Sequence, residues 1–111
     1  MSQTLTGLIA LPADLSAGMA ASVRIEIHDT SLSDAPSVVV STATMRDIAL
    51  VPGGTLPFSI KAPPATVGRA HTLRIHISLD GTEQVRAGDL LTTSSVRVPE
   101  DVSHVPVTVV R

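Results

Sequence analysis

Four side chains of types that bind metal ions or small ligands occur in two stretches of alternating sequence. In residues 22–29 and again in 71–79, apolar residues alternate with polar ones, as they do in strands with one buried face. If the two strands are neighbours, their polar residues gather on one water-facing surface. This candidate binding face consists of Glu26, His28, Arg74 and His76.

The face has both a functional and a structural interpretation. A zinc ion takes at least three protein ligands, so the two histidines would need a third from Glu26, His71 or His104. A cross-strand pair of Glu26 with Arg74, beside two solvated imidazoles, accounts for the same residues without a ligand. We therefore expect no metal and no cofactor, and we keep small-ligand or metal binding at this face as the alternative function.

A second polar cluster follows directly after residues 22–29. Short Asp and Ser side chains cap backbone N–H groups that have left a sheet, so the cluster favours a structural turn motif. Two carboxylates are fewer than a calcium ion requires. The motif consists of Asp29, Ser31, Asp34 and Pro36.

Other chemistries lack their usual sequence context. No Gly-x-Ser-x-Gly elbow surrounds any serine, and Gly53-Gly54 does not begin a phosphate-binding loop. Phe58 is the only aromatic residue and the net charge is -2, so the basic surface with stacking rings that nucleic acid requires is missing. We expect a protein that is not an enzyme and does not bind nucleic acid.

These side chains must be positioned by strands. Val, Ile and Thr make up 33 of the 111 residues, and β-branched side chains fit a pleated sheet. We predict one domain over residues 1–111, an all-β, antiparallel seven-stranded β-sandwich of immunoglobulin-like or transthyretin-like kind, with a small closed barrel as second choice. The predicted strands lie near 4–11, 22–29, 38–45, 56–60, 71–79, 90–95 and 105–110.

Several positions refine this arrangement. Gly7 indicates a bulge or a close backbone neighbour, and the run 38–40 of three valines indicates burial on both faces. Pro57 and Pro106 lack an N–H group, which places their strands at sheet edges. In residues 71–79, the apolar side chains are expected to face the core, and the polar ones to face water. These two sets are Leu73, Ile75, Ile77 and Leu79, and Thr72, Arg74, His76 and Ser78.

Four different motifs follow one another along the chain. Asp-x-Ser-x-x-Asp-Ala-Pro occupies 29–36, a Pro-Phe strand occupies 54–60, the turn Asp80-Gly81 follows, and a valine-rich strand ends the chain. Together they resemble the YscW/YbaY-type lipoprotein family over nearly the whole length. His71 stands where that family usually has a tyrosine.

The resemblance implies a β-sandwich of the bacterial cell envelope, and one branch of the family acts as pilotins for type III secretion secretins. We expect a protein-binding or structural module whose partner is another protein or a second copy. An aliphatic groove between the sheets is the preferred binding surface, because proline at an edge blocks strand pairing.

The beginning of the chain bears on its location. It carries no cysteine and no basic start, and its apolar run 8–11 is too short for a signal peptide or a membrane span. For the chain as given we expect a cytoplasmic location without membrane insertion. If a leader has been removed, we expect a periplasmic or envelope location.

Overall fold

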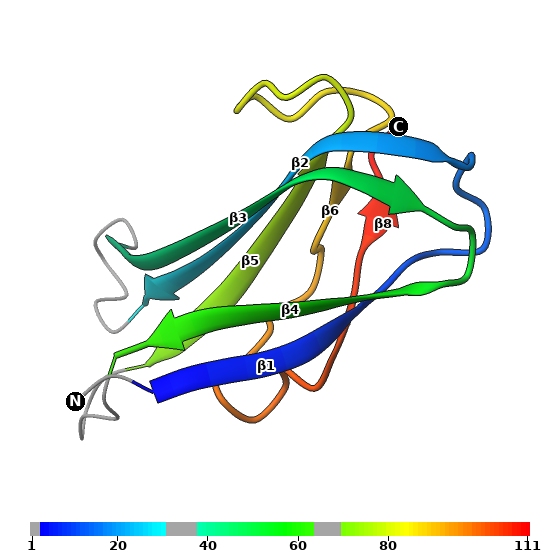
Figure 1. The fold of residues 1–111 in the computed structure, drawn as a ribbon. Coiled ribbons are helices and arrows are strands. Elements are labelled where there is room, and N and C mark those ends of the chain that lie inside the picture. The colour runs from blue at the N-terminus through cyan, green and yellow to red at the C-terminus, as the bar shows by residue number, and fades with distance from the viewer. Residues whose placement is uncertain (1–2, 31–37, 64–69) are drawn as a thin grey trace.

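The computed structural model describes residues 3–30, 38–63 and 70–111, and its regular elements there are all strands (Figure 1). In the described residues, no helix is both long and apolar enough to cross a membrane. The strands are β1 (Gln3–Ala10), β2 (Gly18–Asp29), β3 (Val38–Leu50), β4 (Thr55–Ala62), β5 (His71–Ser78), β6 (Leu90–Leu91), β7 (His104–Pro106) and β8 (Thr108–Val109).

The strands form two sheets that enclose an aliphatic core. One sheet has the order β4-β1-β7 and the other has the order β3-β2-β5-β6-β8. All pairs are antiparallel except β1 with β7. The all-β sandwich is confirmed, with its last predicted strand divided between the sheets. Buried Val107 lies at the division, between β7 in one sheet and β8 in the other.

The alternation in β2 produces the core side of the larger sheet. Val23, Ile25 and Ile27 are completely buried, as the pattern predicted. Each such aliphatic side chain contributes about 1.5–3 kcal/mol when it leaves water. Ile9 of β1 and Phe58 of β4 supply the opposite wall, so the core lies between the two sheets.

Gly7 has a close backbone neighbour, which is one of the two outcomes that the sequence predicted. It lies opposite Phe58 in the β1–β4 ladder, and the carbonyl oxygen of Val102 also approaches it. A Cβ atom at this position would lie 1.9 Å from that oxygen and 2.8 Å from the Phe58 ring. Glycine therefore allows the ring and the chain near Val102 to pack against β1.

The predicted burial of the three valines is wrong. Val38, Val39 and Val40 are 62%, 45% and 42% exposed, because β3 is the edge strand of its sheet. The register against β2 also shifts beside His28, which faces Val39 while Ile27 faces Ser41. Val40 is thus the extra residue of a β-bulge.

The polar side of β5 is only partly exposed to water, contrary to expectation. His76 and Ser78 are buried, and Leu79 is 45% exposed instead of facing the core. The cause is the connection from β5 to β6, whose Asp89 and Asp80 side chains bond to His76 and Ser78. Of the strand predicted over 90–95, only β6 is regular.

The edge positions predicted from the two prolines are confirmed. β4, which contains Pro57, and β7, which contains Pro106, are the two edges of the smaller sheet. Gly53 and Gly81 have φ angles of 72° and 86°, which glycine adopts without steric cost. These turns set the directions of β4 and of the connection after β5.

Candidate functional site

The predicted binding face is assembled by the pairing of β2 with β5. Glu26 lies directly opposite Arg74, and the predicted cross-strand pair is present with 3.6 Å between Arg74 Nη1 and Glu26 Oε1. His28 Nε2 lies 3.0 Å from the same carboxylate oxygen. The Glu26 side chain is only 14% exposed, and Arg74 and His28 both contact its carboxylate.

His76 does not join this group. It lies opposite Arg24, two residue pairs further along the ladder from Glu26, and its Nε2 is 2.9 Å from Asp89 Oδ2. Asp89 also accepts hydrogen bonds from the backbone N–H groups of Arg86, at 3.0 Å, and Leu79, at 3.2 Å. Both partners are almost completely buried, so His76 fastens the connection between β5 and β6 to the sheet.

The electrostatics of Asp89 agree with this role. Burial of the carboxyl group acts to raise its pKa, but hydrogen bonds from His76, Arg86 and Leu79 outweigh burial and hold the pKa below its ordinary value of 3.8. Asp89 therefore remains an anion that holds three donors.

Two further parts of the earlier predictions can be placed on the structure. In the described residues, no group of three or more His, Cys, Asp or Glu side chains is arranged to hold a metal ion. Of the turn motif, Asp29 ends β2, whereas Ser31, Asp34 and Pro36 lie outside the described residues.

A hollow of about 700 Å³ lies beside β4, on the side of the sandwich where β3 and β4 are the edges of their sheets. This volume is within the range of ligand and side-chain pockets in proteins. We call it the β3–β4 groove. None of its lining residues carries a charge, and they are Thr6, Gly7, Leu8, Ala43, Thr44, Met45, Pro57, Phe58, Ser59 and Ser103.

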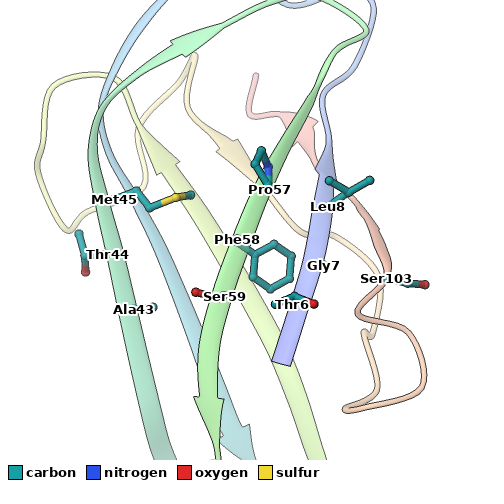
Figure 2. Close-up of a pocket in the computed structure, with 10 residues that line it drawn as sticks. All are labelled: Thr6, Gly7, Leu8, Ala43, Thr44, Met45, Pro57, Phe58, Ser59 and Ser103. Atoms are coloured by element: carbon teal, nitrogen blue, oxygen red, sulfur yellow. The ribbon is translucent and has the colours of Figure 1, made fainter. Parts of the chain in front are cut away.

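Strand β4 crosses this groove between β3 and β1, and Figure 2 shows the Met45 side chain extending from β3 toward β4. Phe58 is 4% exposed and packs over Gly7, so its ring is a rigid part of the floor. A second hollow of about 360 Å³ shares Ala43 and Ser59 with the first. The depression therefore continues along both edge strands.

The sequence predicted an aliphatic groove between the sheets but did not identify these residues. They come from four separate segments, so no local spacing brings them together. Pro57 was the available signal, because it marked β4 as an edge strand. For β3 the sequence was misleading, because its run of three valines predicted a buried strand instead of a sheet edge.

Comparisons with known proteins agree with the observed fold. The family model described as type III secretion system lipoprotein chaperone (YscW) matches residues 1–107. A solved structure of an alternative pilotin from the type II secretion system of Vibrio cholerae shares the fold with a TM-score of 0.69. It has 24% sequence identity, and the match covers 99% of this chain and 96% of that chain. None of the curated proteins matches the chain.

Proposed function

Because the chain belongs to the type III secretion system lipoprotein chaperone (YscW) family, we propose that it is a non-enzymatic chaperone of the bacterial envelope that binds a secretin through the β3–β4 groove. The proposal treats residues 1–111 as one binding domain. The similarity of its fold to a pilotin supports a protein partner.

The observation that carries the proposal is the absence of charge in the groove lining. Leu8, Met45 and Phe58 supply apolar contact surface, and serine and threonine hydroxyl groups supply neutral hydrogen-bonding partners. An uncharged segment with apolar side chains is complementary to such a surface, because no ion has to lose its water on binding. Met45 adds adaptability, since its unbranched side chain fills irregular gaps.

The outer face of the larger sheet has a structural role in this proposal. Glu26 is held by His28 and Arg74, and Asp89 is held by His76 and two backbone N–H groups. Each charged group thereby has its partners within the fold.

The contacts of two serines, one buried and one on the edge strand β3, also support a role without catalysis. The hydroxyl of Ser78 donates to Asp80 and that of Ser41 donates to the carbonyl oxygen of Lys61. The nucleophilic serines of hydrolases are activated by a histidine or lysine base, whereas these two hydroxyls donate to a carboxylate and to a backbone carbonyl.

The proposal is tested by placing charge in the groove. Ser59 is exposed and lines the groove, so Ser59→Glu and Ser59→Arg introduce bulk and opposite charges without touching the core. We expect both variants to weaken binding of the purified type III secretin from the same bacterium at least about tenfold by calorimetric titration. A loss with both signs of charge indicates that the groove itself is blocked.

Matched controls use Ser95, which is exposed and lies outside the groove lining. Ser95→Glu and Ser95→Arg are expected to keep the secretin affinity of the unchanged chain. If both Ser59 variants bind the secretin as tightly as these controls do, the groove is not the binding site.

A further inference from the structure

The four edges of the two sheets differ in how they are protected against strand pairing. β4 carries Pro57 and Lys61, β7 is three residues long and ends at Pro106, and β8 is two residues long. Proline, lysine and short length are among the devices, together with β-bulges, by which natural sheets prevent pairing at their edges. Three of the four edges are therefore protected.

The fourth edge, β3, lacks proline, charge and short length in its first eight residues, and the one irregularity there is the β-bulge at Val40. It is thirteen residues long, and residues 38–45 contain no proline and no charge. β2 pairs with one side of it, and in the described residues no other strand forms a ladder with the opposite side. Val38, Val39 and Val40 are also exposed at this edge. A long, neutral and apolar edge is a surface on which another strand adds.

We propose that β3 pairs antiparallel with β3 of a second copy of this chain, about a twofold axis at Ala43. This pairing places Thr42 of one copy opposite Thr44 of the other and Ser41 opposite Met45, and small Ala43 meets itself on the axis. Threonine pairs across antiparallel strands are favourable. The valines of each copy then lie beside residues 46–48 of the other and lose exposed apolar surface.

The neutrality of this run points to a second copy as the partner. Across a twofold axis each residue meets a residue of the same short segment, so a charge near the axis would face its own sign. The first charged residues, Arg46 and Asp47, lie beyond the neutral run. The regular segment is bounded by the bulge at Val40 and by Asp47, whose φ angle is 55°, so pairing about Ala43 is limited to residues 41–45.

Cysteine cross-linking tests the pairing and its register. The chain has no cysteine, so Ala43→Cys introduces a single thiol on the proposed axis. We expect this variant to form a disulfide-linked dimer under mild oxidation, because opposite Cβ atoms in such pairs lie about 5 Å apart. A mixture of Thr42→Cys and Thr44→Cys chains should cross-link to each other more than either does to itself.

The control is Thr108→Cys, which is exposed on β8 at the opposite edge of the same sheet. If Ala43→Cys forms no more cross-linked dimer than Thr108→Cys does, the proposal is wrong.

Sedimentation of the unmodified chain tests self-association without a thiol. We expect a species of twice the 11.5 kDa chain mass that increases with concentration. Thr42→Lys should weaken dimerisation at least about tenfold by placing a charge near the axis, while Glu26 opposite position 42 favours the folded strand. Thr108→Lys should leave the dimer unchanged.

A chain that remains monomeric up to about 1 mM contradicts the proposal. If β3 amide protons become protected from exchange only when the secretin is added to such a monomer, the edge belongs to a secretin strand, which also overturns self-pairing. Neither sedimentation nor cross-linking requires the secretin, so their results do not depend on the proposed function.

Discussion

The β5–β6 side and the β3 side of the larger sheet differ in how completely their side chains are used by the fold. At β5, buried His76 meets buried Asp89, and the connection to β6 covers the sheet. At β3, three valines are exposed and the strand borders a hollow. The ionisable residues of the β5–β6 side stabilise the fold, whereas aliphatic residues of a type that is usually found in a core form the open surface at β3.

The connection on the β5–β6 side is held in place by two carboxylates. Asp80 accepts hydrogen bonds from Thr82 and Ser78, and Arg86 lies 3.3 Å from it. Asp89 holds the other end of the same connection. Each carboxylate thus stabilises a loop, and no comparable set of contacts fills the β3–β4 groove among the residues that the structure describes.

The largest expected effect is a loss of stability on the β5–β6 side. Asp89→Ala removes a buried anion and leaves three donors, on His76, Arg86 and Leu79, without their acceptor. We expect a loss of about 3 kcal/mol in the free energy of unfolding in urea, and a fall of roughly 10 °C or more in Tm. Asp89→Asn keeps an acceptor oxygen and should lose less. Equal stability of Asp89→Ala and the unchanged chain would show that this side is not fastened by Asp89.

The next effect concerns the floor of the groove. Gly7→Ala places a methyl group against the Val102 carbonyl oxygen and the Phe58 ring. We expect a loss of about 2 kcal/mol in unfolding free energy, because backbone must shift to admit the methyl group. A matched change at Gly18, where a Cβ atom meets nothing within 4 Å, should change stability by less than about 1 kcal/mol. Similar losses at the two glycines would contradict close packing beneath the groove.

A smaller effect appears as the solution is made acidic. The pKa of Asp89 is lower in the folded protein than its ordinary value of 3.8, so Asp89 stabilises the fold above that value. This contribution is lost as the pH falls from 3.8 through the folded-state pKa. We expect urea unfolding of Asp89→Asn to depend less steeply on pH between about pH 5 and 3 than unfolding of the unchanged chain. Parallel pH profiles would refute this assignment.

The smallest effect is expected on the predicted binding face. Arg74 is 42% exposed, so Arg74→Gln should cost less than about 1 kcal/mol in unfolding free energy. Added Zn²⁺ should leave Tm unchanged, since Glu26 is already engaged by His28 and Arg74. A rise in Tm with Zn²⁺ that a chelator reverses would instead assign a metal site to this face.

Alternation and proline positions were sufficient to predict most of the fold. Val23, Ile25 and Ile27 are buried as expected, and the strands of Pro57 and Pro106 are edges. The cross-strand pair of Glu26 and Arg74 followed from the same pattern.

Burial that depends on distant segments was not predictable in this way. His76 alternates as an outward residue but is covered by a connection whose Asp89 is thirteen residues away. The three valines resemble a buried strand, and only the order of strands in the sheet reveals that they are exposed. The groove joins four separate segments, so local spacing carries no signal for it.

The central claim is that the β3–β4 groove, and not the predicted binding face on β2 and β5, binds the secretin. The side-chain methyl groups of methionine report this directly by NMR, because Met45 lines the groove and Met19, which is 59% exposed on β2, does not. Met45→Leu assigns the Met45 signal. On addition of the purified secretin we predict that the Met45 methyl signal shifts or broadens while that of Met19 stays in place. An unchanged Met45 signal in a chain that has bound the secretin would contradict the account.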